Sequence, residues 1–263
     1  MIRAGTGGWT FEPWRGGLFY PKGLARTEEL AFASRKLNSI EINATYHRTQ
    51  PPASFRKWAA ETPDNFVFAV KASRFATNRR VLVEAAPSIE QFLSSGIVEL
   101  GKKLGPILWQ FAPTKKFEAA DFESFLALLP RARNGIPLRH AVEVRHESFL
   151  VPEFVKLARK FGVAIVLAHS DKYPFIADQT ADFTYARLQS SRANVATGYT
   201  TAEIKVWAAR ANAWAAGKAV KELPLLAPAL SPAKSRDVYL YVISGAKERA
   251  PAAAMALLDS LKK

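Results

Sequence analysis

The sequence contains no cysteine, only four histidines and no long apolar run, and each of these absences excludes a class of protein. Without cysteine the chain can form no disulfide, supply no thiolate to a metal and offer no cysteine nucleophile. Four histidines are too few to indicate a histidine-rich metal cage. No apolar run approaches the roughly 18 residues of a membrane span, and the N-terminal MIRAGTGGW lacks the apolar core of a signal peptide. We therefore expect a cytoplasmic protein with no membrane association.

Charge is the unusual global property of the chain. Hydrophobic residues make up 49% of the 263 positions and charged residues 23%, which is ordinary for a globular protein, but the formal net charge is +14. An excess of positive charge favours anionic partners, and nucleic acid is one of them. The basic residues are scattered in pairs such as Arg79-Arg80 and Lys115-Lys116 instead of forming blocks. A generally basic surface is therefore favoured over a dedicated nucleic-acid stripe.

Short apolar segments alternate with helical patterns along the chain. We expect eight strands, near residues 2, 40, 67, 107, 141, 164, 184 and 239, and helices between most of them, including one over 88–104. The connection between the sixth and seventh strands shows no clear helical pattern. Alternating strands and helices predict a parallel sheet, and eight repeats in about 250 residues predict a closed (β/α)8 barrel of the TIM type. An open doubly wound sheet is the alternative.

No linker divides the chain, so we expect residues 1–263 to form a single domain. Residues 218–236 are rich in proline, serine and alanine and predict an inserted loop.

Two predicted strands carry polar residues at their C-terminal ends. In the stretch RHAVEVRHES, Glu143 and Arg145 share one face of the strand because side chains alternate. Glu41 and Asn43 share a face in the same way within SIEIN. Burying such groups is costly unless they are paired or lie at an opening. They therefore predict a site at the carboxyl edge of a parallel sheet.

Projecting the whole sequence onto this edge predicts a site that binds a small anionic molecule, bearing phosphate or carboxylate. Arg145 and Arg187 would clamp the anion, Glu41 or Glu143 would be the general base, and Lys71 or Tyr185 the acid. The N-terminal ends of the strands are poorer in polar groups, which supports this choice of edge. Further expected substrate contacts are Thr6, Trp9, Asn43 and Gln110.

Three other interpretations stay open. The charged residues of the site could simply neutralise one another as an internal ion network made of Glu41, Glu143, Lys71, Arg145 and Arg187. No cofactor is predicted outright, but Glu41, Glu143, His169 and Asp171 could hold Mg²⁺ or Mn²⁺ and support isomerase or phosphodiesterase chemistry. The aromatic segment from Trp9 to Tyr20 could stack bases in a non-catalytic nucleic-acid or anion-binding module, although such residues more often pack a loop.

Six motifs, in matching order and spacing, resemble one known family. They are GTGGWTFEPWRGGLFYP, SIEINATYHR, TPDNFVFAVKA, LGPILWQFAP, AVEVRHESF and DFTYARL. Over nearly its whole length the chain resembles the YecE-like family, domain of unknown function 72. The resemblance implies a TIM barrel and no assigned activity. The family often has a histidine-glycine pair where this chain has Gln189-Ser190, and an asparagine-containing turn where it has residues 244–246, so substrates could differ within the family.

Overall fold

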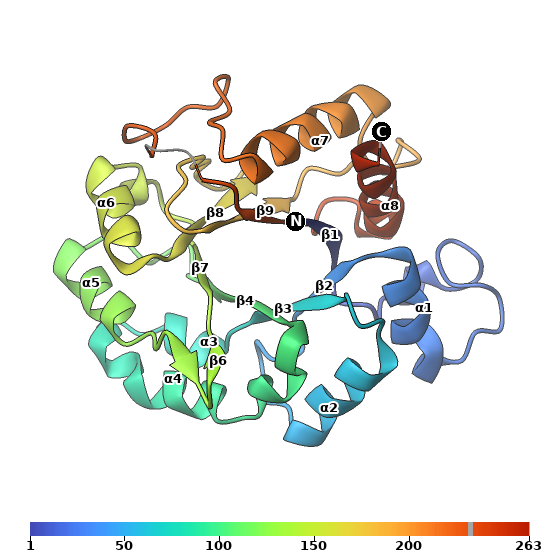
Figure 1. Cartoon of the computed structure of the whole chain (residues 1–263), viewed down its shortest axis with the longest axis horizontal. Helices are drawn as coiled ribbons and strands as arrows, with labels where there is room; N and C mark the ends of the chain where they lie inside the picture. The colour runs from blue at the N-terminus through green and yellow to red at the C-terminus, as the bar shows by residue number, and fades with distance from the viewer. Residues whose placement is uncertain (231–233, 263) are drawn as a thin grey trace.

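Eight parallel strands close into a barrel in the computed structural model, which describes residues 1–230 and 234–262 (Figure 1). The order around the ring is β1-β10-β9-β8-β7-β4-β3-β2, and every neighbouring pair is parallel. This confirms the predicted TIM-type barrel and rules out the open sheet. The strands are β1 (Ile2–Gly7), β2 (Ser39–Ile42), β3 (Val67–Lys71), β4 (Leu104–Gln110), β7 (His140–Glu143), β8 (Ala164–His169), β9 (Phe183–Leu188) and β10 (Asp237–Val242).

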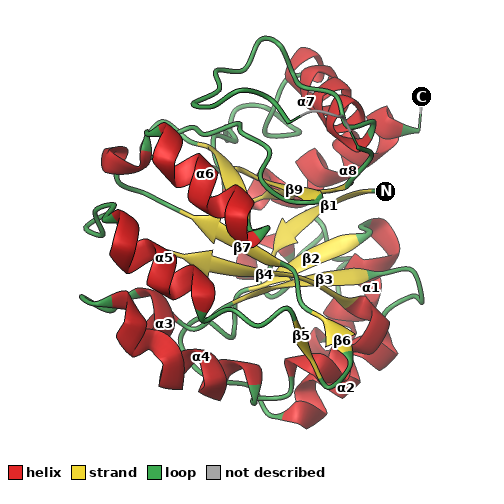
Figure 2. Cartoon of the chain, turned by 60° about the vertical axis from the view of Figure 1, so that its left-hand side comes forward, coloured by secondary structure: helices red, strands yellow, loops and turns green. Residues whose placement is uncertain are grey.

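Helices surround the barrel, as the view in Figure 2 shows. One connection has none, because the chain between β8 and β9, residues 170–182, forms no helix. This agrees with the expectation for the sixth connection. No helix in the described ranges is long and apolar enough to cross a membrane. The helices are α1 (Glu29–Lys36), α2 (Pro52–Glu61), α3 (Arg74–Thr77), α4 (Ala86–Leu93), α5 (Ala119–Ala127), α6 (Pro152–Phe161), α7 (Thr201–Ala215) and α8 (Ala250–Leu261).

Helix α6 shows how the sequence sets these elements. Pro152 occupies the first turn, where its missing N–H costs nothing, and Gly162 ends the helix in the left-handed conformation with φ of 67°. Between them Phe154, Val155 and Ala158 bury one face against the barrel. Burying a large apolar side chain stabilises the fold by about 2 kcal/mol.

The single helix predicted over 88–104 is wrong. Helix α4 ends at Leu93, and a separate 3-10 helix, η4 (Ile97–Lys103), follows it. Gly96 lies between them with φ of 106°, and a Cβ there would lie 2.7 Å from the Cα of Pro52. The close approach of the α2 segment requires glycine at this point, and the left-handed backbone breaks the helical path.

Two connections contain a segment beyond their barrel helix. A short hairpin, β5 (Ala132–Arg133) with β6 (Ile136–Pro137), precedes β7 and was not predicted. The expected inserted loop has neither helix nor strand in its described parts, 218–230 and 234–236. Residues 231–233 of that prediction lie outside the described residues.

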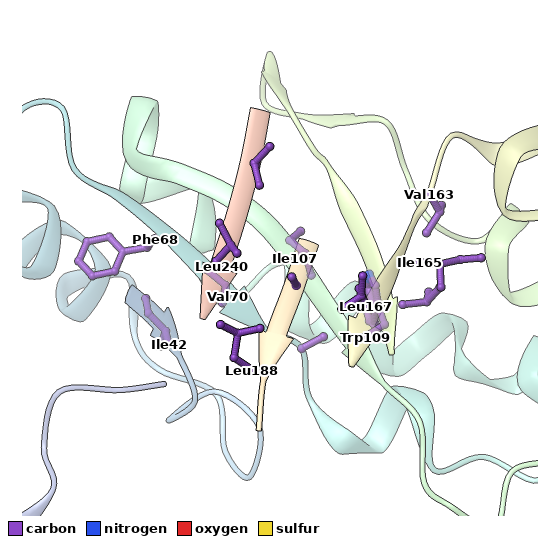
Figure 3. Close-up of a cluster of buried hydrophobic side chains, with 14 of the residues drawn as sticks. Ile42, Phe68, Val70, Ile107, Trp109, Val163, Ile165, Leu167, Leu188 and Leu240 are labelled. Atoms are coloured by element: carbon purple, nitrogen blue, oxygen red, sulfur yellow. The ribbon is translucent and has the colours of Figure 1, made fainter. Parts of the chain in front are cut away.

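Apolar side chains form two layers on either side of the strands. Phe68, Trp109 and Leu188 belong to the outer layer between barrel and helices (Figure 3). A smaller inner cluster includes Leu108 and Tyr241 and fills the barrel interior. The interior is therefore packed, and polar groups of the strands gather at its two ends.

The N-terminal end of the barrel is richer in charge than the sequence suggested. Arg139 donates to Asp237 at 2.9 Å and to the Tyr239 hydroxyl at 2.8 Å, and Asp237 also receives the N-terminal amine at 3.0 Å. The expectation that the N-terminal strand ends are poorer in polar groups is therefore wrong. What distinguishes the C-terminal end is how its charges are paired.

Candidate functional site

The C-terminal mouth of the barrel contains a cavity of about 290 Å³, which we call the basic cavity. Five predicted site residues line it together, and they come from β2, β3, β4, β7, β9 or the residues just after them. This confirms that the strand alternation places these side chains on the inner face. The lining consists of Gly7, Trp14, Asn43, Lys71, Gln110, Arg145, Arg187, Val242, Ile243, Ser244 and Lys247.

Arg187 from β9 ties the floor of the basic cavity together. Its guanidinium donates to Oε1 of Glu41 at 2.9 Å, to Oε1 of Gln110 at 3.0 Å and, at very short range, to Oε2 of Glu143. Both carboxylates are fully buried, and Arg187 is 3% exposed. Burial on its own would lower the pKa of Arg187, but Glu143 and Glu41 outweigh it and raise that pKa. The residue is a permanent cation.

Arg145 completes the set of donors around Glu143. Its Nε donates to Oε1 of Glu143 at 2.7 Å, and an Nη donates to Gln110 at 2.8 Å. Burial would raise the pKa of Glu143, but Arg187 and Arg145 together hold it below its ordinary value. Glu143 is thus a permanent anion with both oxygens engaged.

Glu41 is engaged in the same way. The hydroxyl of Tyr185 donates to its Oε2 at 2.7 Å, while Arg187 occupies Oε1. Burial and the negative charge of Glu41 raise the pKa of Tyr185 well above its ordinary value, so this phenol keeps its proton. Neither carboxylate lines the basic cavity, nor does Tyr185. The geometry favours a supporting role for all three over direct contact with a ligand.

The predicted internal ion network therefore exists, but Lys71 is not part of it. Among the described residues no carboxylate oxygen lies within 4.0 Å of its amine, which sits 4.0 Å from the centre of the Tyr46 ring. Lys71 is 8% exposed and faces the basic cavity. Burial, with the charge of Arg187 adding to it, lowers the pKa of Lys71 from 10.5 to about 8. Within the described part of the chain, the site thus holds a buried cation without a directly paired carboxylate.

Lys247 adds a further cation that the sequence analysis missed. It lies in the 3-10 helix η6 (Lys247–Arg249) after β10, with its amine 4.3 Å from the centre of the Phe11 ring. Burial lowers the pKa of this lysine as well. Four cations line the basic cavity and two carboxylates lie beneath it, so an excess of two positive charges faces the opening. Its place beyond the strand end left no strand pattern to reveal it.

Two predicted contact residues lie elsewhere. Thr6 is buried and its hydroxyl donates to the carbonyl of Gly8 at 2.9 Å, because Thr6 alternates with the inward-facing Gly5 and Gly7 of β1. Gly7 lines the cavity instead, where a Cβ would lie 2.8 Å from Ile243. Trp9 packs edge-on against Trp58 at 5.2 Å between ring centres and does not line the cavity. Both placements correct the projection from the sequence.

The aromatic segment mainly packs the loop after β1. Trp14 and Tyr20 are 1% exposed, and Phe19 contacts both rings. Trp14 also lines the basic cavity, and its indole N–H donates to the carbonyl of Lys247 at 2.9 Å. This segment presents no row of exposed rings of the kind that stacks successive bases.

The four alternative metal ligands are divided between two places. Glu41 and Glu143 are bound by arginine under the basic cavity, whereas His169 and Asp171 line a neighbouring cavity of about 590 Å³. In the described part of the chain no group of three or more histidine, aspartate or glutamate side chains is arranged to hold a metal ion. These residues do not fit a single divalent-metal site.

The fold and this mouth define the class of protein as a TIM barrel with a charged site at its strand C-termini. The family model described as a protein of unknown function, DUF72, matches residues 3–263. The chain belongs to this family. The predicted resemblance is therefore confirmed over nearly the whole chain.

Solved structures support the same fold. A DUF72 family protein of Thermotoga maritima has a TM-score of 0.73 at 22% identity, with all of both chains covered. One from Enterococcus faecalis gives 0.69 at 19% identity, with 100% of this chain and 96% of that chain covered. A xylose isomerase-like TIM barrel/4-hydroxyphenylpyruvate dioxygenase fusion protein gives 0.50 at 14% identity, covering 96% of this chain and 41% of that one. At these identities the likeness shows the fold alone.

One curated relative is similar in sequence. The UPF0759 protein YunF of Bacillus subtilis is 29% identical over 178 residues, which are 65% of this chain and 60% of that protein. The match thus spans less than two thirds of the relative. The family and the fold are established by these comparisons.

Proposed function

We propose that this protein binds a small phosphate- or carboxylate-bearing molecule in the basic cavity and acts on it in the cytoplasm by acid/base chemistry. Lys71 carries this proposal, because it is a buried cation that faces an open cavity, and no carboxylate oxygen of the described residues lies within 4.0 Å of its amine. The difference between pKa values of 10.5 and about 8 corresponds to about 3 kcal/mol against the charged form. A ligand anion would supply the missing partner and offset part of that cost.

Each side chain then has a distinct task. Arg145 and Arg187 supply fixed positive charge to orient the anion, Lys247 adds a further positive charge, and Gln110 and Asn43 add amide contacts. Lys71 with a pKa of about 8 is about one tenth neutral at pH 7, so it can both accept and return a proton. A proton taken from a carbon or hydroxyl next to the anionic group would pass to Nζ and be returned to the product.

Glu41 and Glu143 were predicted as candidate bases, and Tyr185 as a candidate acid. Both carboxylates accept from Arg187, Glu143 also accepts from Arg145, and Glu41 also accepts from Tyr185. Because every carboxylate oxygen already accepts a hydrogen bond, these contacts support a positioning role. From below the cavity they hold the two arginines in position and do not contact the ligand.

A thermal-shift screen of small anions tests the proposal. A ligand that binds only the folded state at 100 times its Kd stabilises it by about 2.7 kcal/mol. Phosphate, sulfate and simple phosphate or carboxylate monoanions should raise the Tm of the wild type but not of Lys71→Met. Lys205→Met, which removes an exposed lysine on α7, is the matched control for net charge and should respond like the wild type.

Two other results would point away from this function. Binding to an oligonucleotide that weakens steeply with salt, without any small-anion response, would favour a nucleic-acid partner. A response to Mn²⁺ or Mg²⁺ that requires Glu41 or Glu143 would favour the metal-dependent alternative.

A further inference from the structure

A second cavity opens beside the basic cavity, and the proposed anion site does not use it. We call it the polar cavity; it measures about 590 Å³. It is built from the ends of β8 and β9 and from the turn after β10. Its lining consists of His169, Ser170, Asp171, Lys172, Tyr173, Gln189, Ser190, Ser191, Arg192, Glu203, Ser244 and Gly245.

The two cavities adjoin each other at two points. Ser244 lines both of them. Arg145 of the basic cavity donates to the hydroxyl of Tyr173 at 3.3 Å and lies 4.3 Å from the centre of its ring. The turn that carries Ser244 packs closely on the chain after β9, since a Cβ on Gly245 would lie 2.7 Å from the carbonyl oxygen of Ser191. The two cavities therefore lie side by side across Ser244.

The charges of the polar cavity cancel. Asp171 and Glu203 oppose Lys172 and Arg192, and Arg192 donates to Oε1 of Glu203 at 2.9 Å. The basic cavity, in contrast, has an excess of two positive charges. This difference favours a ligand with an anionic end and a neutral, polar remainder.

Two side chains that line the polar cavity each have a fully buried polar atom without a partner among the described residues. The two atoms are Nε2 of Gln189 and Nδ1 of His169. Gln189 is 9% exposed. A buried polar atom without a hydrogen bond costs about 1–3 kcal/mol, and these two atoms reach a ligand in the cavity when their side chains rotate. Rotating the Gln189 amide about its terminal bond exchanges its oxygen and nitrogen at the cavity surface.

Hydroxyl groups fit this pair. Nε2 of Gln189 requires an acceptor, whereas Nδ1 of His169 requires a donor or an acceptor according to its tautomer. A hydroxyl meets either need. Burial lowers the pKa of His169, so the imidazole is neutral near pH 7 and adds no charge. The hydroxyls of Ser170, Ser190 and Ser191 border the same space.

We infer that the polar cavity is a subsite for the hydroxyl-bearing part of a sugar or polyol phosphate, whose phosphate lies in the basic cavity. This inference rests on the proposed function and adds the class of substrate. Gln189 and His169 bind hydroxyls, and Ser244 separates the two ends of the ligand.

Calorimetric titration with three ligands tests it. Ethyl phosphate reports on the anion site alone, ribose 5-phosphate adds the hydroxyls, and ribose lacks the anion. In the wild type ribose 5-phosphate should bind about tenfold more tightly than ethyl phosphate, as expected for one or two added hydrogen bonds. Ribose alone should bind far more weakly than either phosphate ester.

Gln189→Met keeps the length of the side chain and removes its amide. It should bind ethyl phosphate as the wild type does and lose the advantage of ribose 5-phosphate. Gln91→Met, on the exposed face of α4, is the matched control and should keep that advantage.

The outcomes separate the two proposals. If ethyl phosphate binds but ribose 5-phosphate binds no more tightly, or if Gln189→Met keeps the full advantage, the subsite is overturned and the anion site stands. If neither phosphate ester binds, the proposed function fails and the subsite with it.

Discussion

Replacing Lys71 by methionine should stabilise the protein while removing its anion binding. Lys71 is protonated in the unfolded chain up to its ordinary pKa of 10.5, whereas burial lowers the pKa in the folded protein to about 8. Folding at neutral pH therefore has to bury a charge that no carboxylate oxygen of the described residues approaches within 4.0 Å, and the more distant Glu41 and Glu143 offset only part of the cost. The difference of the two pKa values amounts to about 3 kcal/mol. Methionine of similar length avoids this cost, so Lys71→Met should raise the free energy of unfolding by about 3 kcal/mol at pH 7.

The difference in the free energy of unfolding between Lys71→Met and the wild type should depend on pH, and this dependence gives the sharper test. Between pH 8 and 10.5 the unfolded chain binds more protons at Lys71 than the folded protein, so wild-type stability at this site rises with pH. The advantage of Lys71→Met is fully present below pH 8 and disappears as the pH approaches 10.5. Other groups that titrate in this range are common to both proteins and cancel in the difference.

Urea denaturation of both proteins at pH 7, 8.5 and 10 measures the gap. The control Lys205→Met should stay within about 0.5 kcal/mol of the wild type at each pH, because its side chain is exposed. A variant that is less stable than the wild type at pH 7, or a gap that does not change with pH, would refute the reasoning. Burying the charge of Lys71 would then carry no such cost, and no ligand anion would be needed to offset it.

Three further predictions concern the same cavity. Sulfate, whose charge is constant over this range, should bind up to about tenfold more weakly at pH 9 than at pH 7, because Lys71 loses its proton above pH 8; isothermal titration would check this, and a flat profile would contradict it. Arg187→Met should destabilise the protein by about 3–5 kcal/mol in urea denaturation, since it leaves Glu41 and Glu143 buried without their shared cation; a loss under 1 kcal/mol would show that the carboxylates are otherwise satisfied. Gly7→Ala should weaken anion binding several-fold in the same titration, because its Cβ would lie 2.8 Å from Ile243 and 3.0 Å from Asn43 at the cavity wall; unchanged affinity would place the ligand elsewhere.

The sequence predicted the barrel because the fold depends on a repeated pattern. Strand-length apolar runs alternate with helical spacing, and the strict alternation of side chains put Glu41 beside Asn43 and Glu143 beside Arg145 on the inner face. The break between α4 and η4 was not predicted, because it depends on contact between Gly96 and the distant Pro52. Such contacts carry no local signal.

The site was only partly predictable for a related reason. Sequence alternation gives the face of a side chain but not its partner, so Lys71 was grouped with the ion network, although the fork of Arg187 reaches both carboxylates. In β1 the inward positions nearest the mouth are Gly5 and Gly7, which have no side chain, so the sequence analysis chose Thr6 as the ligand contact. Lys247 lies in a loop beyond the strand end, where alternation no longer applies.

Arg187 also has a mechanical consequence for the barrel. From β9 it holds a carboxylate of β2 and a carboxylate of β7, two strands that are not neighbours in the ring. It therefore acts as a cross-brace that fixes the width of the mouth from inside, independently of the loops around the rim. Insertions and substitutions in those loops can change what enters the mouth while the spacing of the charges beneath it stays the same.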